Sequence, residues 1–202
     1  FYVGNPTLEE IEAHQFEKVS IELKEGKTLA LLPGSRKQEI SRILPVMLET
    51  AKNLNYENVA IACTDNFNQD FYTQFVGSNE NVKLVYGQAW NLLNQSDVAL
   101  VTSGTATLET ALIGCPQIVL YKTSPLSYTL GKKLIKVKHI SLVNLILNRG
   151  EVVELIQNDV TVNNICKSIG LIQSKQAKLV KNELKLVLGN SKSKVEQFSF
   201  LV

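Results

Sequence analysis

The stretch that decides the fold is 28-TLALLPGSRKQEISRILPVMLETAK-52. The apolar run 28–32 stops at Pro33–Gly34. After it, apolar residues recur at helical spacing at Ile40, Ile43, Leu44, Met47, Leu48, Ala51 and Leu54. A short apolar run bounded by turn residues is typical of a buried strand, and the later spacing is typical of an amphipathic helix. The stretch therefore predicts a strand over 28–32 and a helix over 39–54.

The same alternation continues along the chain. Further strands are predicted at 58–63, 81–85, 98–101 and 117–121. Helices are predicted between them at 67–76, 89–94 and 105–113, and the chain from Ser127 onward is mainly helical in pattern. Strands alternating with helices imply right-handed crossovers and a parallel sheet. The predicted fold class is α/β, a Rossmann-like doubly wound parallel sheet, which binds ligands at the carboxyl ends of its strands.

Length and charge limit the function classes. The chain has 202 residues, with 21 Lys plus Arg against 19 Asp plus Glu and a net charge of +2. A strongly basic nucleic-acid binder and an acidic disordered chain are therefore excluded by bulk charge. The first residue is Phe1 rather than Met, so we expect the chain to begin inside a longer protein. No apolar run approaches the roughly 18 residues that span a bilayer.

Cysteine and histidine usage excludes most metal chemistry. Cys63, Cys115 and Cys166 form no C-x-x-C pair, which indicates reduced core cysteines in a cytosolic protein. The only histidines are His14 and His139, too few for a multi-histidine site. No Asp-x-Asp occurs, so we expect no metal and no cofactor. A diphosphate leaving group would then depend on amides, helix dipoles and Arg or Lys.

The loop after the first strand is the first candidate site. Gly34 lets the backbone turn, and Ser35 is a candidate N-cap with Gln38 three residues later. The free amides of a helix start favour an anion, and Arg36 adds a forked donor suited to phosphate. A capped helix with exposed charges would show the same residues, so the spacing alone leaves both interpretations open.

The loop after the fourth strand is the second candidate site. Small residues let a ligand approach the backbone closely, at Ser103, Gly104, Thr105, Ala106 and Thr107. Glu109, one turn into the helix, could accept hydrogen bonds from a sugar diol, although it could equally complement the helix dipole. Two such loops on parallel strands of one sheet suggest a nucleotide diphosphate site. Gly87, after the third strand, could let a base or ribose approach.

A lysine-rich stretch follows the fifth strand. Between 122 and 138 the chain carries no acid but five lysines, Lys122, Lys132, Lys133, Lys136 and Lys138. Apolar residues share the stretch at Leu126, Leu130, Leu134 and Val137. A basic amphipathic helix can lie on an anionic membrane surface. A helix docked on its own domain with a solvated lysine face is the alternative.

Taken together, the motifs resemble one family. They occur in order as Tyr2-Val3-Gly4-Asn5-Pro6, Leu31-Leu32-Pro33-Gly34-Ser35-Arg36-x-x-Glu39-Ile40, Ser103-Gly104-Thr105-Ala106-Thr107-Leu108-Glu109, Ser141-Leu142-x-Asn144-Leu145 and Glu154-Leu155-Ile156-Gln157. Over about residues 2–170 the chain resembles lipid-A-disaccharide synthase, an inverting glycosyltransferase. The resemblance implies the C-terminal, donor-binding half of a GT-B enzyme. It divides the chain into a linker from a missing N-terminal half (1–27), a UDP-sugar-binding domain (28–170) and a C-terminal helix and tail (171–202).

The resemblance also implies the reaction. A 2,3-diacylglucosamine passes from its UDP derivative to 2,3-diacylglucosamine 1-phosphate, giving a tetraacyl disaccharide 1-phosphate and UDP. The enzyme would be peripheral on the cytoplasmic face of the inner membrane of a Gram-negative bacterium, and a homodimer would be allowed. The general base would lie in the missing half, so we expect this chain alone to bind donor and turn over nothing.

Residue roles follow from the same resemblance. Arg36 would stabilise the diphosphate, with Gly34 and Ser35 beside it, and residues 103–107 would face the phosphates. Glu109 would hold the ribose hydroxyls and Gly87 would lie near the uracil, while Tyr121 and Asn144 would line the same cleft. Two other functions stay open from the sequence, a non-catalytic UDP-sugar-binding module and a UDP-sugar 2-epimerase-like domain.

Overall fold

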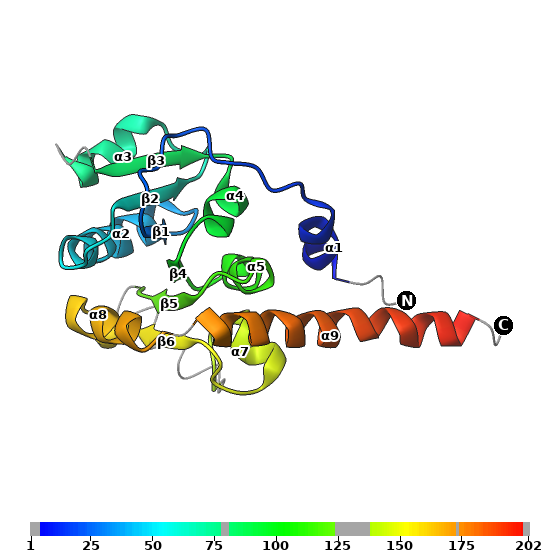
Figure 1. Ribbon diagram of the computed structural model, residues 1–202. Helices are drawn as coiled ribbons and strands as arrows, with labels where there is room; N and C mark the ends of the chain where they lie inside the picture. Colours follow the sequence, from blue (N-terminus) through cyan, green and yellow to red (C-terminus); the bar gives the residue numbers. More distant parts are fainter. Residues whose placement is uncertain (1–4, 78–80, 124–137, 173, 200–202) are drawn as a thin grey trace.

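The sheet has the predicted doubly wound topology. The computed structural model describes residues 5–77, 81–123, 138–172 and 174–199. Six parallel strands lie in the order β3-β2-β1-β4-β5-β6, which reverses direction between β1 and β4 (Figure 1). Their bounds are Thr28–Leu32 (β1), Asn58–Cys63 (β2), Val82–Tyr86 (β3), Val98–Thr102 (β4), Gln117–Tyr121 (β5) and Val153–Ile156 (β6). Such a reversal is where open α/β sheets bind ligands.

Helices cover both faces of the sheet (Figure 1). One face carries α2 (Lys37–Lys52), α3 (Gln69–Val76) and α8 (Val162–Leu171). The other face carries α4 (Ala89–Asn94), α5 (Thr105–Ile113), α7 (Leu142–Leu147) and α9 (Ser174–Ser199). Side chains alternate along each strand, so Leu29 and Leu31 of β1 pack in the core on the α2 side, whereas Ala30 and Leu32 pack on the α5 side. Each fully buried leucine contributes about 1.5–3 kcal/mol.

One predicted helix is shifted by two residues, and two local expectations, the Ser35 cap and an all-helical region after the fifth strand, were wrong. The helix expected over 39–54 begins at Lys37, and its N-cap is Arg36, which makes no side-chain capping bond; Ser35 is exposed and does not cap it. The strand β6 lies in the region expected to be mainly helical. It has only four residues, half-buried or exposed, so it lacks the apolar run that marks the other strands.

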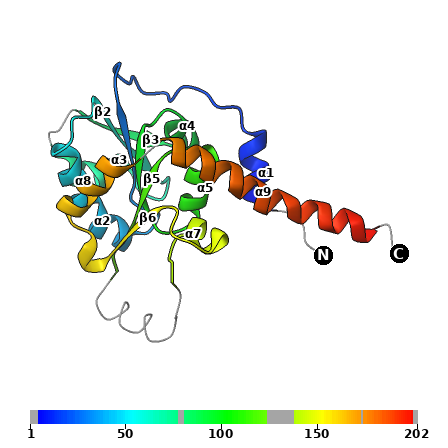
Figure 2. The ribbon, with the colours of Figure 1, turned by 60° about the horizontal axis from the view of Figure 1, so that its bottom comes forward.

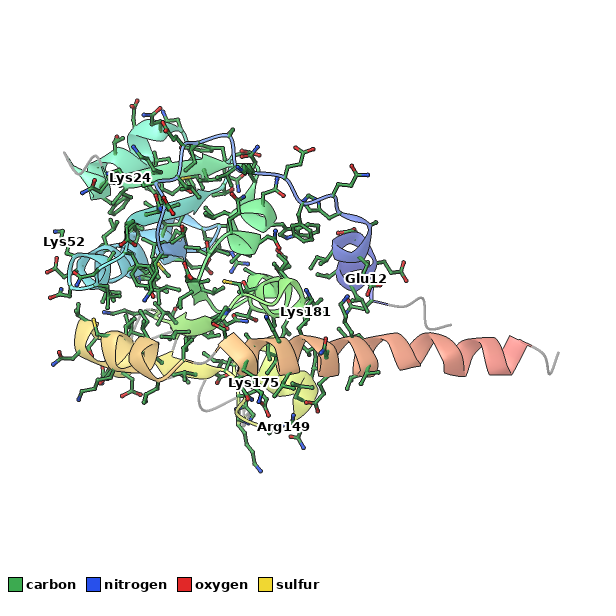
Figure 3. All side chains as sticks on the ribbon, viewed as in Figure 1. Glu12, Lys24, Lys52, Arg149, Lys175 and Lys181 are labelled. Carbon is green, nitrogen blue, oxygen red and sulfur yellow. The ribbon has the colours of Figure 1, made fainter. Side chains whose placement is uncertain are left out.

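The first segment of the chain is attached to the sheet domain. The helix α1 (Pro6–Ala13), absent from the sequence prediction, is capped by Asn5 and buries Leu8 and Ile11. Its Glu12 pairs with Lys185 of α9 at 3.0 Å (Figure 3). Nearer the sheet, Asn58 exchanges two hydrogen bonds with the backbone of Lys24. The segment therefore packs on the domain over its described length, while the predicted domain boundaries stay a prediction.

The helix α9 lies along the domain and then runs past it (Figures 1 and 2). It packs on α5, where the Lys181 ammonium donates to the carbonyl of Ile113 at 2.8 Å (Figure 3). Arg149, after α7, pairs with Glu183 of α9 and with Glu151. None of the helices in the described part of the chain is long and apolar enough to cross a membrane.

Candidate functional site

The loops after β1 and β4 meet at the carboxyl edge of the sheet. Residues Leu32 and Val101 are partners in the β1–β4 ladder. Just beyond them, Gly34 has φ +99, and a Cβ placed on it would lie 2.9 Å from Glu39 Oε2 and 3.6 Å from Thr102 Cγ2. The left-handed backbone favours glycine here, whereas the Glu39 carboxylate, at the end of a flexible side chain, could move aside. The two candidate loops predicted from the sequence thus follow neighbouring strands at the same edge of the sheet.

Arg36 lies at the outer rim of this junction. Its Nη1 is 3.0 Å from Glu39 Oε1, and its side chain is 82% exposed. An exposed ion pair of this kind contributes about 1 kcal/mol or less. The exposed guanidinium can therefore turn from Glu39 to a phosphate at a small cost in free energy. Ser35 is exposed beside it.

The start of α5 presents bare backbone amides. Gly104 is the N-cap, with no side-chain capping bond and no acid in the first turn of the helix. Gly104 and Thr105 are exposed and Ala106 is half-buried. The buried Thr107 turns its hydroxyl back to the carbonyl of Gly104 at 2.8 Å. The amides and the positive end of the helix dipole are therefore unopposed, an arrangement that binds anions.

Ser103 and Asn144 are brought to this edge, but their polar groups bond within the protein. The Ser103 hydroxyl donates to the carbonyl of Ile140 at 2.9 Å. Asn144 is 1% exposed. Its Nδ2 donates to Val152 O and to Glu154 Oε1, and its Oδ1 accepts from the amides of Glu151 and Val152. The Asn144 side-chain amide thus makes all four of its hydrogen bonds within the protein. It connects α7 to residues 151–154 and does not present a free polar group to the cleft.

Glu154 holds the segment that receives Ser103. Its carboxylate accepts from the amides of Ile140 and Ser141, at 3.0 and 2.9 Å, and from the Ser141 hydroxyl at 2.7 Å. His139 Nδ1 lies 4.0 Å from the same group. Glu154 therefore fixes the position of residues 139–144 against the loop after β4. Sequence reasoning assigned no role to Glu154, because its partners come from backbone and from residues that no spacing rule connects.

Glu109 and Gly87 both lie next to helix α4. Trp90 of α4 donates its indole N–H to Glu109 Oε2 at 2.7 Å. Gly87, exposed with φ +64, precedes α4 and lines a cleft of about 480 Å³. The other lining residues are His14, Cys63, Thr64, Asp65, Gln88, Ala89, Trp90 and Asn91. Sequence reasoning missed Trp90 and His14; the signal available was that Trp90 is the single tryptophan of the chain and lies three residues after Gly87.

The cleft contains a thiol that is not an activated nucleophile. Burial raises the pKa of Cys63 to about 12. The neighbouring Tyr86 also has its pKa raised to about 12, chiefly by burial. Both groups stay protonated near neutral pH, and a thiol in that state is a poor nucleophile. The cleft is therefore suited to binding rather than to covalent chemistry at Cys63.

The remaining predicted residues lie at the β5 side of the edge. Tyr121 ends β5, is half-buried and pairs with Ile156 of β6. Most of the lysine-rich stretch, with Lys132, Lys133 and Lys136, lies outside the described residues. A separate cavity of about 330 Å³ is lined by Pro116, Gln117 and Val153 among others. These residues lie at the amino ends of β5 and β6, so that cavity is remote from the candidate loops.

Fold and site together define a class of protein. Solved glycosyltransferases share the fold: the glycotransferase of kitacinnamycin has a TM-score of 0.60 at 12% identity, covering 92% of this chain and 46% of that one. The spinosyn rhamnosyltransferase SpnG, complexed with thymidine diphosphate, has a TM-score of 0.54 at 14% identity, covering 89% and 51%. The chain therefore has the Rossmann-like fold of one half of a GT-B glycosyltransferase.

The family follows from sequence similarity. The model of the Lipid-A-disaccharide synthetase family matches residues 1–198, and the chain belongs to this family. It is 36% identical to the lipid-A-disaccharide synthase of Syntrophus aciditrophicus (strain SB) over 196 residues, covering 91% of this chain and 51% of that protein. It is 37% identical to the enzyme of Myxococcus xanthus (strain DK1622) over 179 residues, covering 83% and 46%. The chain thus spans about half the length of these relatives, and the family match decides against the 2-epimerase alternative.

Proposed function

We propose that this chain is the donor-binding half of a lipid-A-disaccharide synthase. The whole enzyme would transfer 2,3-diacylglucosamine from its UDP derivative to 2,3-diacylglucosamine 1-phosphate, releasing UDP and a tetraacyl disaccharide 1-phosphate. The observation that carries the proposal is the carboxyl edge of the sheet. There the uncapped start of α5 and the exposed Arg36 follow two neighbouring strands, and Glu109 of α5 is bonded to Trp90, which lines the cleft.

Each group has a role in holding the leaving UDP. The α5 amides, Gly104 to Ala106, would bind the diphosphate, with Gly34 and Ser35 alongside. Arg36 would swing from Glu39 and neutralise the charge that develops on the departing phosphate. Preformed donors of this kind stabilise developing charge without reorganisation. Glu109 would accept from the ribose hydroxyls, and the uracil would enter the cleft beside Gly87.

The chemistry at the acceptor belongs to another part of the enzyme. Deprotonating the acceptor hydroxyl needs a positioned general base. We propose that this base is supplied by the missing N-terminal half, so the present chain binds donor without turnover. A non-catalytic UDP-sugar-binding module would have the same site, and only the joined enzyme distinguishes the two.

Calorimetric titration with UDP tests the proposal in two stages. The 202-residue chain should bind UDP equally with and without Mg²⁺. The chain joined to the N-terminal portion of a full-length relative should form disaccharide, and the chain alone should not. A folded chain that binds no UDP would contradict the donor site. Binding without disaccharide formation in the joined protein would favour the non-catalytic module.

Membrane attachment and self-association complete the proposed function. The lysine-rich stretch, with Lys122 and Lys138 at its described ends, supports peripheral binding to the anionic cytoplasmic face of the inner membrane. Co-sedimentation with anionic vesicles, lost at high salt, is the expected result; equal binding to neutral vesicles would contradict it. Exposed Leu179, Leu186 and Val187 on α9 support a homodimer, which sedimentation analysis of the full-length enzyme tests.

A further inference from the structure

We infer that Trp90 is a positioning residue that sets the recognition of the nucleotide ribose through Glu109. This inference rests on the proposed function and adds to it a residue that the motif comparison did not select. The carrying contact is the hydrogen bond from the indole Nε1 to Glu109 Oε2, 2.7 Å long, between α4 and α5. An N–H to a carboxylate at that distance is a charge-assisted bond, about twice as strong as a neutral one.

The Trp90–Glu109 hydrogen bond affects how the Glu109 carboxylate can bind the two hydroxyls of a ribose. An indole N–H can only donate, and a carboxylate offers about four acceptor positions. The Trp90 N–H occupies one acceptor position on Oε2 and so restrains rotation of the carboxylate. In this orientation Oε1 could accept hydrogen bonds from the hydroxyls of a ligand. Without the bond, the half-buried Glu109 side chain could rotate. Ordering it on binding would then reduce the affinity for the ligand.

Trp90 is itself held from the other side. His14 meets the Trp90 ring edge-on, with centroids 5.3 Å apart and an interplanar angle of 87°. The His14 Nε2 lies 2.9 Å from Oδ1 of Asn91, which is buried. Phe16 packs edge-on against His14 at 4.8 Å. The segment that precedes the sheet thus supports the indole, and the indole in turn supports Glu109.

The position of Trp90 links two parts of the site. Its side chain lines the cleft that contains Gly87, while its N–H contacts the helix whose start is expected to bind the diphosphate. A residue in this place should affect the ribose contact and leave the phosphate contact unchanged. That separation gives the inference a signature that general destabilisation would not produce.

The test compares three ligands on five chains, of which the last is a control. UDP, 2′-deoxy-UDP and inorganic pyrophosphate are titrated by calorimetry into the wild-type chain, Trp90→Phe, Glu109→Gln and the double variant. Phenylalanine keeps an aromatic ring at this position and removes the N–H donor, together with one of the two rings of the indole. Phe75→Leu is the matched control, since it alters an aromatic cluster of α3 that lies on the other face of the sheet from Trp90.

Trp90→Phe should weaken UDP roughly tenfold, the loss expected for one hydrogen bond to a charged group. Pyrophosphate affinity should stay within about twofold, and the preference for UDP over 2′-deoxy-UDP should shrink. Adding Trp90→Phe to Glu109→Gln should cost little more, because the two residues act as one unit. Phe75→Leu should bind all three ligands as the wild type does.

Two results would overturn the inference while leaving the proposed function intact. One is a Trp90→Phe chain that keeps the wild-type preference for UDP over 2′-deoxy-UDP. The other is an equal loss of UDP and pyrophosphate binding, which would indicate a general structural effect. A wild-type chain that binds no UDP would instead overturn the proposed function, and the inference would fall with it.

A second measurement needs no substitution of Trp90. It is the single tryptophan of the chain, so its emission reports on this site alone. Saturation with UDP should change the emission, and pyrophosphate should change it less. UDP binding proven by calorimetry with no change in the Trp90 emission would count against the inference.

Discussion

The starts of α2 and α5 follow neighbouring strands and look alike in sequence, yet they present different surfaces to an anion. In α2 the first turn contains Glu39, whose carboxylate lies over Gly34 and pairs with Arg36. In α5 the first turn contains no acid, and Gly104 leaves the amides uncapped. On the proposed function, the α5 start would bind the diphosphate through the backbone, whereas the α2 start would contribute through the Arg36 side chain.

A second difference is how each start is held. The α5 start is fixed from outside, because Ser103 bonds to Ile140 and Ile140 is bound by Glu154. The end of α5 is bound by Lys181 from α9. In α2 the pairing partners are local, within three residues. A rigid backbone site and a mobile side chain are thus combined at one edge of the sheet.

The largest expected effect comes from breaking the support of the α5 start. Asn144→Asp removes the amide donor to Glu154 and places a second carboxylate beside it in a buried position. We expect a loss of about 3 kcal/mol in the free energy of unfolding, as for other buried pairs left uncompensated. Urea unfolding measures it, and UDP affinity of the folded protein should also fall.

The matched control for that substitution is at the opposite edge of the sheet. Asn58 is also buried, and its amide also ties a loop by reciprocal backbone bonds, here to Lys24. Asn58→Asp should lower stability and leave UDP affinity unchanged. If Asn58→Asp weakened UDP as much as Asn144→Asp, the support would not be specific to the α5 start.

The second-largest effect is expected from removing the exposed side chain of Arg36. Arg36→Ala should weaken UDP by about thirtyfold, the loss of a charge-assisted contact worth roughly 2 kcal/mol. The melting temperature should not change, because the side chain is 82% exposed. Arg42→Ala, farther along α2, is the control and should bind UDP normally. Equal affinities of the Arg36 and Arg42 variants would remove Arg36 from the site.

An acid in the first turn of α5, as in α2, would show whether the uncapped amides bind the diphosphate. Thr105→Glu places an acid in the first turn of α5, where it favours the helix by about 0.3–1 kcal/mol. The same carboxylate would oppose a phosphate, so UDP should weaken roughly tenfold while stability rises. Thr105→Gln, similar in shape and uncharged, separates charge from bulk. Unchanged UDP binding in Thr105→Glu would place the diphosphate elsewhere.

The smallest effect concerns the anchoring of α9. The Arg149 guanidinium lowers the pKa of Glu183 by hydrogen bonding and charge. Because the pKa of Glu183 is lower in the folded than in the unfolded state, its ionised carboxylate stabilises the folded protein at pH values above the unfolded-state pKa. This stabilisation is lost as the pH falls through the folded-state pKa. The melting temperature of the wild type should therefore fall slightly more than that of Glu183→Gln between about pH 6 and about pH 3. Identical falls would show that the pair contributes nothing measurable.

The sequence predicted the parts of the fold that depend on local patterns. Apolar runs located five strands, and the helical spacing after Gly34 located α2 to within two residues. The half-buried strand β6 escaped because its residues do not form an apolar run. Helix α1 escaped because only Leu8 and Ile11 are buried in it.

The site was predictable only where it follows a strand. Gly34, Arg36 and residues 103–109 were found because loops after neighbouring parallel strands must converge. The bonds Trp90–Glu109 and Asn144–Glu154 join residues 19 and 10 positions apart, on different elements. No periodicity or capping rule links such pairs, so their partners became visible only in the fold.

Amide-resolved NMR during a UDP titration would show whether UDP binds through the backbone at the start of α5. We expect the largest shifts at Gly104, Thr105 and Ala106, with smaller shifts at Gly87 and at the amides beside Arg36. Shifts confined to residues of the cavity near Gln117, at the amino edge of the sheet, would contradict it.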